Sequence, residues 1–124
     1  MLRVGVTELD IGFENREEAK KRCLEVMEEA CANGVELLVF PEMTLTGFTM
    51  RPWLHAESWD ADNIPDSVSF FMENSRKYKM QMAFGYIRAV MADGSLVDDE
   101  MKEKDYENRL VLVDGGNVLL DYTK

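Results

Sequence analysis

The chain has 124 residues, of which 46% are hydrophobic and 31% are charged, a composition typical of one soluble globular domain spanning residues 1–124 and not of a disordered chain. With 24 acidic against 14 basic residues, the net charge is −10, which argues against a nucleic acid or an anionic membrane as partner. No run approaches the roughly 18 apolar residues of a membrane span, and the N-terminus lacks the pattern of a signal peptide, so we predict a cytoplasmic protein.

The first third of the chain predicts a strand, a helix and a second strand. Residues 2–9 alternate around Val4 and Val6 and indicate a strand. Asn15 with Glu18 is typical of a helix start, and Asn33 followed by Gly34 of a helix end. The expected buried face of this helix comprises Ala19, Cys23, Val26, Met27, Ala30 and Cys31. Residues 35–40 are an apolar run that stops at Pro41, which predicts a strand buried on both faces, as in a parallel sheet.

Cys23 and Cys31 are the only thiols of the chain. Eight residues of helix separate them by roughly 12 Å, beyond the reach of a disulfide. We therefore expect both to be reduced core residues.

The remaining chain predicts a long loop, a helix, a strand and a hairpin. Residues 43–65 read as irregular, and loops of that length in compact domains are usually functional or disordered. A helix is expected over 66–79 and a strand over 80–90, followed by a turn at 92–95 and a charged excursion at 98–105. Residues 107–114 and 118–122, joined by Gly115, Gly116 and Asn117, predict a hairpin. The order of elements predicts an α/β fold.

Glu42 stands directly beyond the predicted strand of residues 35–40. Ligands of open α/β sheets bind at the carboxyl ends of the strands, whereas a loop acid that caps a turn or pairs with a lysine is the alternative. The sequence PEMTLTGF, residues 41–48, resembles the first signature of the carbon-nitrogen hydrolase, or nitrilase, superfamily. Residues 107–124, ENRLVLVDGGNVLLDYTK, resemble the hairpin of that family that leads into its Tyr-x-Lys.

This resemblance implies the N-terminal part of a four-layer α-β-β-α sandwich, with Glu42 as general base and Lys124 as catalytic lysine. It implies hydrolysis of a small non-peptide amide through a thioester, without cofactor or metal. The family's nucleophilic cysteine lies after the lysine, so we expect the chain to be truncated before it and to be inactive alone. Cys23 and Cys31 are poor substitutes because they fall mid-helix on an apolar face. The alternative is an inactive partner-binding or dominant-negative fragment.

Three further features concern substrate and partners. Phe48 and the following Thr49 and Met50 resemble the wall of the family's substrate pocket, although ordinary loop packing explains them equally well. GFTM, residues 47–50, resembles the GFSM of the ω-amidase branch. His55 is the sole histidine and is expected to have no catalytic role. As partners we expect a small-molecule amide and either further copies of the chain or a complementing C-terminal part.

Overall fold

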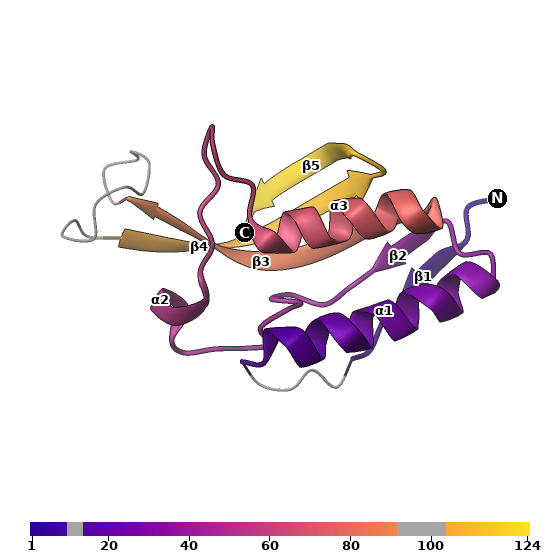
Figure 1. Ribbon diagram of the computed structural model, residues 1–124, viewed down its shortest axis with the longest axis horizontal. Helices are drawn as coiled ribbons and strands as arrows, with labels where there is room; N and C mark the ends of the chain where they lie inside the picture. The colour runs from indigo at the N-terminus through magenta and orange to yellow at the C-terminus, as the bar shows by residue number, and fades with distance from the viewer. Residues whose placement is uncertain (10–13, 92–103) are drawn as a thin grey trace.

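A computed structural model describes residues 1–9, 14–91 and 104–124. These residues form one five-stranded sheet with helices beside it (Figure 1). The elements, in chain order, are β1 (Val4–Val6), α1 (Arg16–Ala32), β2 (Leu37–Val39), α2 (Pro52–His55), α3 (Asp66–Tyr78), β3 (Gln81–Met91), β4 (Lys104–Asp114) and β5 (Asn117–Thr123). The α/β fold class is thus confirmed.

The spatial order of the strands follows the chain, β1-β2-β3-β4-β5. β1, β2 and β3 are parallel, whereas β4 and β5 pair antiparallel as a hairpin. The hairpin is confirmed, and its turn places Gly115 at a φ of +60°, a conformation that favours glycine. Because β1 to β3 are parallel, their carboxyl ends share one edge of the sheet, and the loop that contains Glu42 leaves from that edge.

One face of the sheet is covered by α1 and α3, which lie side by side (Figure 1). The side chain of Asn15 accepts a hydrogen bond from Glu18 N at 3.2 Å, so the predicted helix start is confirmed. At the centre of the core, the ring of Phe71 on α3 stacks on Phe84 of β3 with centroids 4.2 Å apart. From α1, the residues at most 7% exposed are Ala19, Cys23, Met27 and Ala30.

The opposite face of the sheet is open in the described chain. Val4 is 50% exposed, Val6 80% and Leu120 46%. The register carries this apolar face across all five strands, since Val6 pairs with Val39, Val39 with Ala83, Ala83 with Leu112 and Leu112 with Leu120. The expected burial of residues 35–40 on both faces is seen on one face only in the described chain: Leu38 is buried under the helices, whereas its neighbours on β2 are half-buried because both helices occupy one face of the sheet.

Other predictions need smaller corrections. Cys31 is exposed instead of buried, because the helix face that meets the sheet passes through Cys23, Met27 and Ala30. The first strand is shorter than residues 2–9, and the expected irregular segment contains the single turn of α2. The predicted turn at 92–95 and most of the charged excursion lie outside the described residues, while Lys104 and Asp105 belong to β4. Within the part of the chain described, no helix is long and apolar enough to cross a membrane.

Candidate active site

Glu42 is held by a tight turn that crosses the carboxyl end of the sheet. The main chain before it pairs with β3 through Phe40 N and Ala83 O at 2.8 Å. Beyond it, Thr44 N donates to Gly85 O at 3.0 Å, and the Thr44 hydroxyl accepts from Gly85 N at 3.2 Å. The same hydroxyl donates to Pro41 O at 2.6 Å. Phe40 before the carboxylate and Thr44 beyond it thus fasten the turn to β3.

Gly85 permits this turn to approach the sheet. A Cβ built on Gly85 would lie 2.8 Å from Met43 N and 3.0 Å from Glu42 Cα. Distances that short do not occur between a real Cβ and main-chain atoms without a shift of the backbone. Sequence reasoning did not single out Gly85, although an interior glycine in a strand pattern is a general signal of a close backbone approach and could have drawn attention to this position.

Lys124 follows β5 and is held in register by β4. Its main-chain N donates to Asn108 O at 2.9 Å, which continues the pairing of β4 with β5. Beside it, the nearly buried guanidinium of Arg109 forms an ion pair with Asp121 at 2.6 Å and contacts Thr123 and Glu107. These contacts tie the last residues of β5 to β4, so the pairing of the two strands fixes the main chain from which the Lys124 side chain extends.

The structure brings the two residues of the family motif together. Nζ of Lys124 lies 2.5 Å from Oε1 of Glu42, although the residues are 82 positions apart. The side chains of Glu42 and Lys124 are 60% and 35% exposed. The hydrogen bond and the positive charge of Lys124, with a further contribution from Asn108, hold the pKa of Glu42 below its usual range. The carboxyl group is therefore ionised at neutral pH and able to accept a proton. It lacks, however, the burial that raises the pKa of a typical carboxylate general base.

A cavity of about 200 Å³ lies next to this pair. It adjoins Glu42 because Met43 and Asn108 both line it, and its wall is mostly apolar. The lining residues are Met43, Thr49, Pro52, Ile87, Tyr106, Glu107 and Asn108. A small apolar cavity beside convergent polar groups is the usual form of a small-molecule site.

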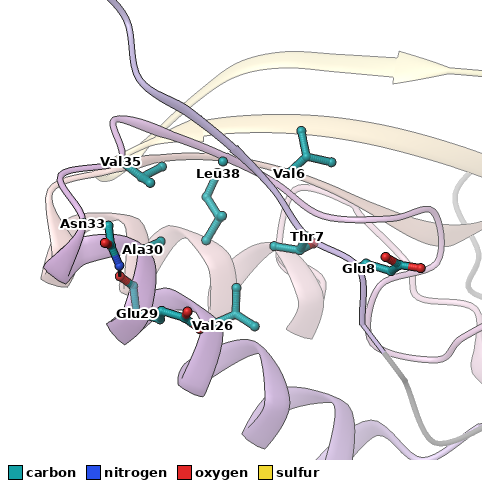
Figure 2. A pocket seen from close by; sticks show the side chains of 10 residues that line it. Val6, Thr7, Glu8, Val26, Glu29, Ala30, Asn33, Val35 and Leu38 are labelled. Carbon is teal, nitrogen blue, oxygen red and sulfur yellow. Dashed lines mark hydrogen bonds between the residues drawn. The ribbon is translucent and has the colours of Figure 1, made fainter.

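A larger groove of about 330 Å³ lies between α1 and the strands β1 and β2. Figure 2 shows Val26, Glu29 and Ala30 of α1 near Thr7, Val35 and Leu38. Glu42 and Lys124 themselves line neither the groove nor the smaller cavity. The smaller cavity is lined by Met43 and Asn108, which adjoin Glu42, whereas no described residue that lines the groove contacts the pair.

The other residues singled out from the sequence lie apart from the pair. Phe48 is 63% exposed and is not among the residues that line the cavity, whereas Thr49 is. His55 ends α2, with Nε2 3.6 Å from Oε1 of Glu14. Burial raises the pKa of the Cys23 thiol to about 12, which leaves almost no thiolate at neutral pH. Among the described residues, no group of three or more His, Cys, Asp or Glu side chains is arranged to hold a metal ion.

The described residues thus form an α/β fold in which a Glu and a Lys meet at the edge of the sheet where ligands of such folds bind. The carbon-nitrogen hydrolase family model matches residues 3–124, and the chain belongs to this family. No curated protein matches the chain in a sequence search.

Two amidases are among the solved structures that share this fold. An amidase of the nitrilase superfamily from Nesterenkonia AN1 superposes with a TM-score of 0.75 at 14% identity, covering 99% of this chain and 43% of that protein. An N-terminal amidase, solved also with a Gln-Val peptide, has a TM-score of 0.72 at 19% identity, covering 99% of this chain and 28% of that protein. The chain thus spans less than half of these structures, and the likeness confirms the N-terminal part of the nitrilase-superfamily fold.

Proposed function

We propose that this chain supplies the base and the oxyanion-stabilising lysine of an amidase. The observation that carries the proposal is the contact between Glu42 and Lys124, 2.5 Å apart beside a small cavity. Membership of the carbon-nitrogen hydrolase family and the amidase neighbours support the reaction class. In this proposal the domain is incomplete, and the nucleophilic thiol comes from chain beyond Lys124.

The chemistry assigns a separate task to each residue. Glu42 accepts the proton of the thiol, and the thiolate attacks the amide carbonyl carbon. Lys124 stabilises the negative charge that develops on the carbonyl oxygen. The C–N bond then breaks, and ammonia leaves with the proton that Glu42 returns. Water then hydrolyses the thioester: Glu42 accepts a proton from the water and passes it to the thiolate released when the C–S bond breaks.

The surroundings of Glu42 bear on how the base works. An exposed carboxylate with a lowered pKa is a weak base, and covering it with protein would raise its pKa toward neutrality. We infer that the segment carrying the thiol also covers Glu42. The base then reaches its working pKa only when the site is complete.

The experiment that tests this function starts from the coding sequence. We expect it to continue past Lys124 to a cysteine, and the protein that includes this cysteine to release ammonia from a panel of ω-amides, carbamoyl compounds and nitriles. Glu42→Gln keeps the shape of the side chain but cannot take the thiol proton, so formation of the thioester should fall by at least about 100-fold. Lys124→Ala should act similarly through lost charge. If either variant keeps kcat within a few-fold of the parent, that residue does not have the proposed role.

One observation favours a second function, that of an inactive chain that binds a partner. The open face of the sheet exposes Val4, Val6 and Leu120, an apolar surface that suits a protein partner. A stop codon directly after Lys124, together with a stable complex between this chain and a complete carbon-nitrogen hydrolase, would favour this alternative over the amidase.

A further inference from the structure

Asn108 of β4 contacts both residues of the proposed catalytic pair. Its main-chain oxygen accepts from Lys124 N at 2.9 Å, and its side-chain Nδ2 lies 3.5 Å from Oε2 of Glu42. Across the sheet it pairs with Ile87 of β3. One residue of β4, a strand paired on both sides, therefore touches the lysine through its backbone and the base through its side chain.

The contact with Glu42 determines which way round the amide of Asn108 lies. Glu42 is ionised and only accepts hydrogen bonds, so the NH2 group of Asn108 must face it. If the amide were turned round, two acceptor oxygens would face each other. The Oδ1 atom of Asn108 consequently points away from the carboxylate.

This Oδ1 atom is buried and has no hydrogen-bond partner among the described residues. Buried acceptors in folded proteins are almost always paired, because an unpaired one loses its hydration without compensation. Asn108 also lines the cavity of about 200 Å³ beside Glu42, together with the apolar side chains of Ile87 and Pro52. A ligand N–H that reaches this atom from the cavity would satisfy it, and this requires a small shift of the amide because the atom itself has almost no accessible surface.

We propose that Asn108 recognises the substrate, its Oδ1 accepting a hydrogen bond from the N–H of a primary carboxamide while its Nδ2 orients Glu42. This inference rests on the proposed amidase function, and it adds that the site selects amides over esters and nitriles, which have no N–H to donate. Asn108 is thereby both a substrate-binding residue and a positioning residue for the base. The selectivity is assigned to one atom, because Thr49 and Glu107 of the cavity wall already have hydrogen-bond partners, whereas Oδ1 of Asn108 has none among the described residues.

Binding of small probes to this chain tests the proposal without any turnover. Propionamide, methyl propionate and propionitrile share a three-carbon chain, to which the ester adds an O-methyl group, and only propionamide has an N–H. Ligand-observed NMR, which tolerates self-association of the protein, should show propionamide binding about five- to tenfold tighter than the other two, the gain expected of one added hydrogen bond. Equal binding of the three probes, or no binding of any, would overturn the proposal.

Three variants separate the two tasks of Asn108. Asn108→Ala should abolish the preference for propionamide, whereas the control Ile87→Val, which trims the same cavity, should weaken all three probes alike. Asn108→Asp keeps an acceptor oxygen but replaces the donor with a negative charge, so it should retain the preference while raising the pKa of Glu42, measured by NMR titration of its carboxyl carbon. A preference that survives in Asn108→Ala would refute the recognition role, even if the complete protein proves to be an amidase. Loss of ammonia release in Glu42→Gln concerns only the proposed function.

Discussion

Replacing Gly85 by alanine should displace Glu42 without touching its side chain. The added Cβ would meet Met43 N at 2.8 Å and Glu42 Cα at 3.0 Å, whereas unstrained contacts begin at roughly 3.5 Å. The turn must therefore retreat by about half an ångström, and neither neighbour is a flexible side chain. The retreat stretches both hydrogen bonds that Thr44 makes with Gly85.

The size of the effect follows from that geometry. Overpacking a close contact costs about 1–3 kcal/mol of stability, and this exceeds the gain of about 0.5–1 kcal/mol from the lower unfolded-state entropy of alanine. At the upper end, we expect Tm to fall by roughly 4–8 °C. A shifted Glu42 also loses part of its contact with Lys124, so its pKa should rise toward the ordinary carboxyl value. In a complete enzyme, a misplacement of this size should reduce kcat by at least about tenfold.

The assay combines thermal unfolding with an NMR titration of the Glu42 carboxyl carbon. Gly5→Ala is the matched control, because its Cβ would meet only side-chain carbons of Leu38 and Val35, at 3.2 Å, far from the candidate site in the fold. The control should leave the pKa of Glu42 unchanged. If Gly85→Ala neither lowers Tm nor raises the pKa of Glu42 relative to this control, Gly85 is not needed for the close approach of the turn to β3.

The remaining predictions concern charge, thiols and association. Lys124→Ala should raise the pKa of Glu42, and because a depressed carboxyl pKa contributes stability that is lost as pH falls through it, the parent should lose more stability than this variant between about pH 5 and pH 3; equal pH profiles would contradict the pairing. A thiol reagent at pH 8 should modify Cys31 quickly and Cys23 only on unfolding, since burial raises the pKa of the Cys23 thiol to about 12; two fast thiols would show that α1 does not pack as described. The chain alone should release no ammonia from the amide panel, and turnover that survives iodoacetamide would reveal another nucleophile. Because of the open sheet face, sedimentation velocity across a hundredfold concentration range should show self-association, and a sharp monomer that binds no apolar dye would argue that this face is not an interaction surface.

Local signals in the sequence were sufficient for most elements and for the two motif residues. The cap formed by Asn15, the helix end at Gly34 and the alternation of the last two strands depend on neighbours a few residues away, and each is present in the structure. Glu42 and Lys124 are singled out because residues 41–48 and 107–124 resemble signatures of the carbon-nitrogen hydrolase family. Their family roles remain proposals.

Only the tertiary structure decided how these pieces act together. Local sequence patterns do not predict that β1, β2 and β3 lie in this order beside the hairpin. This strand order brings Nζ of Lys124 to within 2.5 Å of Oε1 of Glu42. The exposure of Cys31 and of the second face of the sheet follows from where α1 and α3 pack, and apolarity alone could not distinguish one buried face from two. Asn108 and Gly85 gained their importance in the same way, because a hydrogen-bond partner and a close backbone contact are supplied by segments distant in the chain. Short-range patterns encode secondary structure, whereas a site assembled from several strands exists only once long-range pairing has placed those strands side by side.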